Sequence, residues 1–461
     1  MQFSLITLGC DKNTVDSERY IASIVEHGGI ATDDLGEADV IIVNTCGFID
    51  AAKAESIDAI VNAGRFKDRG RCKAVVAVGC MVERHKDELV AALPEVDAFL
   101  GASECDRLVP MLIERGLIDS EILAHPGERV YAGTLPHVRY LKVSEGCDHG
   151  CAFCAIPLMR GRHRSFAVAD VVREAQLLEL QGALEVNLVA QDLAHYGRDL
   201  RDGVGLADLL VTLLRETSIP WFRNLYLYSA GITPRLLEVI AAEPRILRYL
   251  DMPMQHGSDR VLVAMRRPER QASIRERVAR YRDAVPGLAI RTTVIVGFPG
   301  ETDDDFSRLC DFLDELSLER VGVFTYSPQE GTHAAHLVDD VPESLKLERQ
   351  ERLMQLQRGI TADRYEARVG WRATALVDHA AAGGEPALAR LPWQADDIDG
   401  VTRLDRDVAA GTFVDVEVTG VVDDYDFTAR VVGMKGRPAV TTSHRALPMA
   451  PSTPSTGSYG R

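Results

Sequence analysis

The feature of the sequence that most constrains the fold is an alternation of short apolar runs with segments of helical periodicity. Near the N-terminus the runs and the helical segments between them are Phe3–Leu8, Val15–Glu26, Val40–Asn44, Ala51–Ala63 and Ala74–Val78. Strands that alternate with helices form parallel sheets with helices on their faces. The sequence therefore predicts an α/β fold class, with a doubly wound parallel sheet over residues 1–118.

A second alternation follows the first and predicts a barrel. Its six candidate strands are Arg139–Ser144, Glu185–Ala190, Asn224–Tyr228, Arg248–Met252, Ala289–Val296 and Arg320–Tyr326. Six units in about 190 residues are too few for a closed eight-stranded barrel, which needs about 250 residues. We expect a partial (β/α)6 TIM-like barrel within residues 133–364, with its functional face at the carboxyl ends of the strands. A long connecting helix is expected from Pro342 to about Val369.

The last part of the chain has a different pattern. Short candidate strands without intervening helices lie at Arg372–Asp378, Ala387–Leu391, Thr412–Thr419 and Ala429–Val432. Such a pattern predicts a small β-barrel, here over residues 366–437. Residues 438–461 are rich in Pro, Ser, Thr and Gly and predict a disordered tail.

Composition limits the classes of partner. No stretch approaches the roughly 18 apolar residues that a membrane span needs, and no Lys or Arg precedes the first apolar run, as it would in a signal peptide. We expect a cytoplasmic protein without a membrane partner. The net charge of −17 also disfavours direct nucleic-acid binding and favours a small molecule or a basic protein. Acidity that serves solubility alone is the alternative interpretation.

The strongest local motif is Cys147-Asp-His-Gly-Cys151-Ala-Phe-Cys154, directly after the first barrel strand. Three thiolates can ligate three irons of one cubane cluster and leave the fourth iron open. A zinc site would need a fourth ligand, and the sequence offers none at suitable spacing. This spacing at the end of a barrel strand is the signature of the radical S-adenosylmethionine (SAM) enzymes, in which the open iron chelates SAM. Three incidental thiols are the alternative.

Four other positions resemble that superfamily more weakly and are predicted to contact SAM. Phe153 lies between the last two cysteines, where a ring packs against adenine; a core aromatic is the alternative. Glu185 and Gln191 belong to the segment EVNLVAQD of the second barrel strand, where ribose and methionine contacts are expected. Gly297 follows the fifth strand and allows a close backbone approach. The compatible alternative there is a turn that leads to Thr302 as a helix N-cap.

Three further cysteines predict a second cluster. Cys10, Cys46 and Cys80 each lie just past a predicted parallel strand. Because the carboxyl ends of parallel strands share one edge of a sheet, these thiols can converge as a three-cysteine site, again with an open iron. Buried unreactive thiols are the alternative. The remaining cysteines, which we interpret as ordinary free thiols, are Cys72, Cys105 and Cys310.

Two three-cysteine motifs on one chain are typical of one enzyme family. Residues 1 to about 437 resemble the radical SAM methylthiotransferases, with an N-terminal methylthiotransferase domain, a radical SAM core and a C-terminal TRAM barrel. The subgroup that modifies small-subunit ribosomal protein S-twelve is the most similar. The segments that carry this resemblance are TLGCDKNTVDSE, LKVSEGCDHGCAFCAIPLMRGRHRS, DMPMQHGSDRVLVAMRR and WQADDIDG. One departure is Phe166, where the family often has Arg after Ser165.

The resemblance implies a mechanism with two 4Fe–4S clusters. Cys147, Cys151 and Cys154 would hold the cluster that cleaves one SAM to a 5′-deoxyadenosyl radical, after an electron arrives from a donor such as flavodoxin or ferredoxin. A second SAM would methylate a sulfur held at the cluster of the N-terminal domain. That sulfur would then join the β-carbon of an aspartate in protein S-twelve. The N-terminal ligands in this scheme are Cys10, Cys46 and Cys80.

Two alternatives remain open. A related branch methylthiolates a tRNA adenosine, but residues 370–430 hold five Arg or Lys against twelve Asp or Glu, which would repel RNA. We instead expect Trp393, exposed beside Asp396, Asp397 and Asp399, to dock the basic ribosomal protein; a solvated acidic face is the alternative. A non-enzymatic iron–sulfur carrier is the second alternative, although carriers normally close each cluster with four thiolates.

Overall fold

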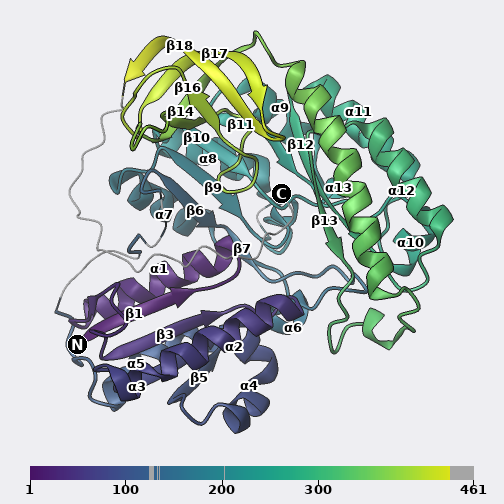
Figure 1. Ribbon diagram of the computed structural model, residues 1–461. Coiled ribbons are helices and arrows are strands. Elements are labelled where there is room, and N and C mark those ends of the chain that lie inside the picture. Colours follow the sequence, from purple (N-terminus) through teal and green to yellow (C-terminus); the bar gives the residue numbers. More distant parts are fainter. Residues whose placement is uncertain (124–128, 132, 134, 202, 437–461) are drawn as a thin grey trace.

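A computed structural model describes residues 1–123, 129–131, 133, 135–201 and 203–436. Figure 1 shows three β-sheet units in chain order, with the N-terminal unit in purple and the C-terminal unit in yellow. Within the described part of the chain, no helix has both the length and the apolar character to cross a membrane. The predicted tail at 438–461 lies outside the described residues.

The N-terminal unit is a five-stranded parallel sheet with the strand order β2-β1-β3-β4-β5. Its strands are β1 (Gln2–Thr7), β2 (Ile30–Ala31), β3 (Val40–Thr45), β4 (Ala74–Gly79) and β5 (Ala98–Gly101). The helices are α1 (Asp11–Glu26), α2 (Asp50–Gly64), α3 (Phe66–Arg69), α4 (Cys80–Ala92), the 3-10 turn η1 (Ala102–Arg107) and α5 (Leu108–Glu114). Apolar clusters cover both faces of the sheet. The doubly wound prediction is thus confirmed, and the two short strands β2 and β5 are additions that the sequence analysis missed.

The central unit is an open sheet of six parallel strands in the order β13-β12-β11-β10-β9-β6. These strands are β6 (Val138–Lys142), β9 (Glu185–Val189), β10 (Trp221–Asn224), β11 (Ile246–Asp251), β12 (Ala289–Val296) and β13 (Arg320–Thr325). The outer helices are α7 (Val168–Leu180), α8 (Leu206–Glu216), α9 (Pro234–Ala242), α10 (Asp259–Ala264), α11 (Gln271–Ala284) and α12 (Asp303–Leu316). The partial barrel is confirmed. The strand predicted at 224–228 is observed earlier in the chain, as β10. The backbone leaves the extended region at Tyr226, where φ is +60°.

Short elements lie at the mouth of the barrel, around the cysteine loop. A two-stranded ribbon of β7 (Ser144–Glu145) and β8 (Arg164–Ser165) encloses the cysteine loop and α6 (Ile156–Arg160). Three 3-10 turns also lie on connections between barrel elements, namely η2 (Leu193–His195), η3 (Ser229–Gly231) and η4 (Ala334–His336). The loop that carries the strongest sequence motif is therefore held at both of its ends.

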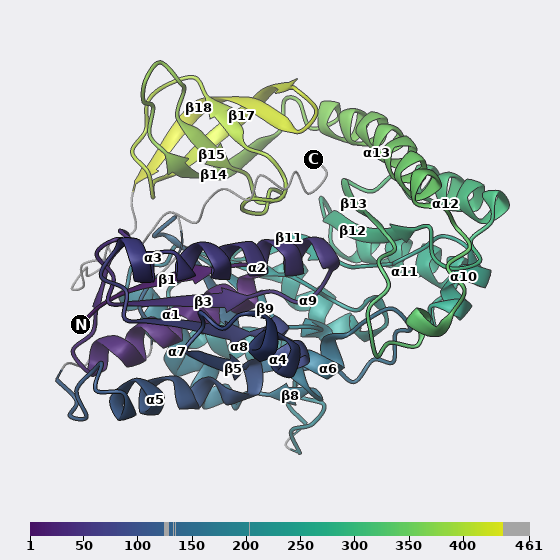
Figure 2. The same ribbon diagram turned by 60° about the horizontal axis from the view of Figure 1, so that its bottom comes forward.

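The long helix α13 (Glu343–Glu366) leads to a closed five-stranded barrel. Its strands are β14 (Arg372–His379), β15 (Leu388–Arg390), β16 (Thr402–Leu404), β17 (Phe413–Val422) and β18 (Asp426–Gly436). The β-barrel prediction is confirmed, although the short strand β16 was not expected. Figure 2 shows this small barrel and the N-terminal sheet as separate units, each against the central barrel.

Buried ion pairs join the three units. Arg129, just before the central barrel, pairs with Glu18 of α1, and Arg139 of β6 lies 3.2 Å from the same carboxylate. On the opposite side, Arg390 of β15 lies 2.6 Å from Glu185 at the start of β9. Since removal of one partner leaves a buried charge uncompensated, such pairs hold the relative positions of the units strongly.

Candidate functional site

The N-terminal cysteines lie at one edge of their sheet. Cys10 immediately precedes α1, Cys46 follows β3, and Cys80 is the first residue of α4 after β4. Their close approach requires a glycine: Gly9 has φ +92°, and a Cβ there would lie 2.9 Å from the sulfur of Cys46. The strand order β1-β3-β4 places the three strand ends beside one another, so the structure brings these cysteines together.

Two buried asparagines connect the strand-end loops. Asn13 Nδ2 donates to the carbonyls of Leu8 at 2.7 Å and Thr45 at 3.2 Å. Asn44 Nδ2 in turn donates to the carbonyl of Asn13 at 3.0 Å. Each cysteine loop therefore depends on its neighbours. The sequence analysis missed both residues; the available signal was an asparagine within three residues of two of the cysteines, in CDKN and VNTC.

The barrel cysteines occupy a single loop after β6 and β7. The backbone N–H of Cys147 donates to Gly161 at 3.1 Å, and that of Cys154 donates to Cys151 at 3.2 Å. Between them, Ala152 is bonded through its backbone N–H to Met265, at the end of α10. Backbone contacts within and around the loop therefore set the positions of all three thiols.

Burial raises the pKa of four cysteines in the two triplets. It raises the pKa of Cys46 to about 12 and that of Cys80 to about 11 in the N-terminal triplet. In the barrel triplet it raises the pKa of Cys147 to about 11 and that of Cys154 to about 12. Such thiols are protonated and unreactive at neutral pH unless a metal deprotonates them.

The grouping of the thiols differs from that of a single metal-ion site. Among the described residues, neither triplet has its three sulfurs within 4.8 Å of one another, as the donors of one metal ion would be. All six cysteines are free of disulfides. A set of three cysteine thiols provides three of the four ligands of a cubane iron–sulfur cluster and leaves one iron open.

The weaker predicted residues do not all lie together. Phe153, in the cysteine loop, packs against a cluster that includes Phe298. Gln191, past the end of β9, donates to Glu145 at 3.0 Å. Gly297 has φ +73° and a Cβ there would lie 2.2 Å from Lys346 Cγ, so contact with α13 alone requires a glycine.

Glu185 departs from the expected position. It begins β9, at the edge of the sheet opposite the cysteines, because parallel strands end where Gln191 lies. Its fully buried carboxylate pairs with Arg223 at 2.8 Å and with Arg390. These arginines hold the pKa of Glu185 below its usual value against the opposing effect of burial. In the structure Glu185 therefore links the central barrel to the small barrel, through Arg390.

A cavity of about 320 Å³ opens beside Cys151. On its wall, His149 stacks on Tyr228 with 4.1 Å between ring centroids, and its Nε2 lies 2.7 Å from Asp192. Arg267 covers the Tyr228 ring at 4.0 Å and donates to the sulfur of Cys151 at 3.6 Å. The sequence analysis missed Tyr228 and Arg267, because no motif marks the ring and the arginine follows a separate helix.

Comparisons with known proteins place this geometry in a family. Residues 2–101 match Uncharacterized protein family UPF0004, residues 141–313 match the Radical SAM superfamily, and residues 369–432 match the TRAM domain. The chain is 46% identical over 435 residues, 93% of its length and 92% of the relative, to "Ribosomal protein uS12 methylthiotransferase RimO" of Anaeromyxobacter sp. (strain Fw109-5). The chain belongs to the RimO family of radical SAM methylthiotransferases.

Further matches support this placement. The RimO relative from Desulforudis audaxviator (strain MP104C) is 43% identical over 442 residues, which cover 94% of this chain and 97% of the relative. A solved structure, the radical SAM methyltransferase TsrM from Kitasatospora setae with cobalamin and a [4Fe-4S] cluster bound, has a TM-score of 0.52 at 14% identity. It covers 71% of this chain and 76% of that chain. At that identity the likeness concerns the fold alone.

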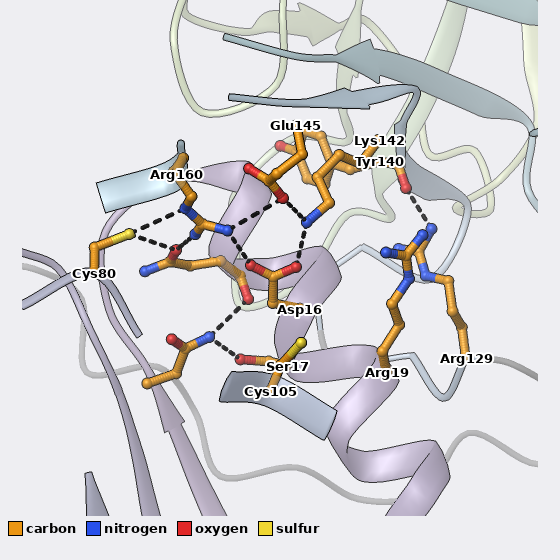
Figure 3. Close-up of polar contacts among 12 residues, drawn as sticks. Asp16, Ser17, Arg19, Cys80, Cys105, Arg129, Tyr140, Lys142, Glu145 and Arg160 are labelled. Carbon is orange, nitrogen blue, oxygen red and sulfur yellow. Dashed lines mark hydrogen bonds and ion pairs between the residues drawn. The ribbon is translucent and has the colours of Figure 1, made fainter. Parts of the chain in front are cut away.

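One arginine lies between the two triplets of this chain. Figure 3 shows Arg160, at the end of α6, between the sulfur of Cys80 and the carboxylates of Asp16 and Glu145. Ala155 and Met159, which follow the barrel triplet, pack directly on Cys80. The two cysteine sites are therefore neighbours across the interface between the units.

The TRAM loop differs from the expected docking surface. Trp393 is only 8% exposed and packs among core residues, so the prediction of an exposed tryptophan is wrong. Asp399 is fully buried and accepts a hydrogen bond of 2.6 Å from Tyr249 of β11. The guanidinium of Arg368 lies 4.4 Å from the Trp393 ring. The Trp393 indole and the Asp399 carboxylate therefore make contacts within the protein that hold the TRAM barrel in place.

Proposed function

We propose that this chain methylthiolates the β-carbon of an aspartate side chain in small-subunit ribosomal protein uS12. In this proposal one SAM is the radical source and a second SAM is the methyl donor. The observation that carries the proposal is the presence of two neighbouring thiol triplets, each with three cysteines. The name shared by the RimO relatives supports the choice of protein substrate.

The ligands divide between two 4Fe–4S clusters. Cys147, Cys151 and Cys154 would hold the cluster that binds SAM, with Phe153, Gln191 and Gly297 toward the cofactor. The N-terminal cluster would be held by Cys10, Cys46 and Cys80. When bound, these groups supply reductive cleavage of SAM at the barrel and a sulfur for transfer at the N-terminal sheet.

The chain's own residues position the reaction and exclude water from it. The apolar side chains of Ala155 and Met159 line the contact between the two sites and are almost fully buried. The cation of Arg267 lies over Tyr228 and beside Cys151, where it would offset the negative charge of a thiolate that holds the cluster. An electron donor such as flavodoxin or ferredoxin would deliver the reducing equivalents to this barrel site.

The reaction has a definite balance of atoms. The β-carbon would lose one hydrogen atom to the deoxyadenosyl fragment that one electron releases from the first SAM, with methionine as the other product. It would gain one sulfur from the N-terminal site, carrying a methyl group from the second SAM, and the one electron released when this carbon–sulfur bond forms would pass to the N-terminal cluster. The proposed product is a 3-methylthioaspartate, and the chain's cysteines remain as ligands.

A peptide experiment tests this function. Reconstituted protein, SAM and a chemical reductant are incubated with a uS12 peptide whose target aspartate carries deuterium at the β-carbon. We expect the peptide to gain one methylthio group, and the deuterium to appear in 5′-deoxyadenosine. A peptide with alanine at the target position is the matched control. Modification of a tRNA adenosine with no change in the peptide would instead support the tRNA branch.

A further inference from the structure

Arg160 is buried at the interface between the barrel and the N-terminal sheet. It ends α6, which follows directly after Cys154, and Gly161 with φ +70° then turns the chain back. Its side chain is only 5% exposed. A guanidinium stays protonated in proteins at all ordinary pH values, and that of Arg160 pairs with the carboxylate of Asp16.

The guanidinium uses its planar set of donors in two directions. Toward the N-terminal site, Nε donates to the sulfur of Cys80 at 3.1 Å, and Nη2 donates to Asn13 Oδ1 at 2.5 Å. In the other direction, Nη1 lies 2.6 Å from Asp16 and 3.4 Å from Glu145. Lys142 of β6 contacts both of these carboxylates (Figure 3). The cation at the sulfur is therefore fixed in orientation.

Hydrogen bonds to ligand sulfurs are among the main determinants of cluster potentials. A donor that carries positive charge stabilises the more negative, reduced state of the cluster and raises its reduction potential. We propose that Arg160 raises the reduction potential of the N-terminal cluster through its bond to Cys80, and that it does so only while the N-terminal sheet is docked on the barrel.

The dependence on docking follows from where the partners lie. Arg160 belongs to the loop of the barrel cysteines, whereas Cys80, Asn13 and Asp16 belong to the N-terminal unit. Separation of the two units would remove the N–H···S bond together with the cation. The inference rests on the second cluster of the proposed function. It adds that one barrel residue adjusts the potential of that cluster.

The test is a redox titration followed by electron paramagnetic resonance. It is made on the full chain with both clusters, and again with Cys147, Cys151 and Cys154 replaced by Ala, so that the remaining signal comes from the N-terminal cluster. Arg160→Gln should weaken reduction of that cluster about tenfold, a fall of about 59 mV for one electron. Arg160→Lys retains the positive charge but lacks the planar set of guanidinium donors, so a smaller fall in the midpoint potential is expected.

Two other variants test the direction of the shift in midpoint potential and provide a control. Asp16→Asn removes a negative charge that acts on Cys80, so the midpoint potential should rise rather than fall. Arg84→Gln is the matched control, because Arg84 also crosses the interface, to Gln329 and the Glu330 carbonyl, and donates to the backbone of Gly47. Its midpoint should equal that of the wild type.

The outcomes separate this inference from the function on which it rests. If the chain with the three barrel replacements binds no iron, the second cluster is absent and the proposed function fails. If it binds iron and the midpoints of Arg160→Gln and wild type agree, the inference is wrong while the function stands. If Arg160→Gln does not retain its cluster, unchanged midpoints in both Arg160→Lys and Asp16→Asn would overturn the inference.

Discussion

The two cysteine triplets are assembled in opposite ways. The barrel triplet occupies one loop of eight residues, Cys147 to Cys154, and the sequence alone places its members near one another. The N-terminal triplet comes from three strand ends and exists only because β1, β3 and β4 are adjacent and parallel. A local site depends on its loop, whereas an assembled site depends on the whole sheet that supports it.

This difference predicts different sensitivities to change. In the barrel loop the thiols are positioned by backbone hydrogen bonds that most side-chain replacements leave intact. In the N-terminal site, by contrast, separate loops are connected by the packing of Gly9 on Cys46 and by hydrogen bonds from the side-chain amides of Asn13 and Asn44. We therefore expect the N-terminal site to fail first when residues other than cysteines are changed.

The largest effect is expected from the barrel triplet. Replacement of Cys147, Cys151 and Cys154 by Ala should abolish reductive cleavage of SAM and remove about half of the bound iron, because this site provides the open iron for SAM. Iron analysis and assay of 5′-deoxyadenosine check both results. Iron that stays at the wild-type level would show that other residues ligate the cluster.

The second-largest effect is expected from a glycine variant in the N-terminal site, compared with one in the barrel loop. Gly9→Ala should lose most iron from the N-terminal site, since φ +92° and a contact of 2.8 Å with Cys46 Cβ both oppose a side chain. The backbone strain alone costs about 1–3 kcal/mol. Gly150→Ala, in the barrel loop, is the matched control, because its Cβ would have no atom within 4 Å. Equal iron loss in both variants would contradict the distinction between the two sites.

The smallest effect concerns Asp396 in the TRAM loop, where burial raises the pKa to about 7. The folded state therefore retains a proton that the unfolded state releases, and stability falls as the pH rises from about 4 to about 7. Asp396→Asn removes this penalty and should stabilise the chain at pH 8 by roughly 1–4 kcal/mol, with no gain near pH 4. Urea unfolding at both pH values measures the difference; a gain independent of pH would refute the burial argument.

The sequence predicted the convergence of Cys10, Cys46 and Cys80 because each follows a predicted strand and the carboxyl ends of parallel strands share one edge of a sheet. It placed Glu185 correctly at the start of its strand, but the pairing of this carboxylate with Arg223 and Arg390 depends on segments far away in the sequence. It also misjudged Trp393, whose exposure depends on packing against Arg368 and the central barrel. Contacts between distant segments, such as that of Arg160 with Cys80, leave no mark on local sequence pattern.

Replacement of Cys10, Cys46 and Cys80 by Ala tests the central claim most directly. The measurement is made on one reconstituted sample, for iron content, 5′-deoxyadenosine and modification of the uS12 peptide. We predict about half of the wild-type iron, continued cleavage of SAM and no methylthiolated peptide. Methylthiolation at the wild-type level, or complete loss of SAM cleavage with the barrel still folded, would contradict two clusters with separate roles.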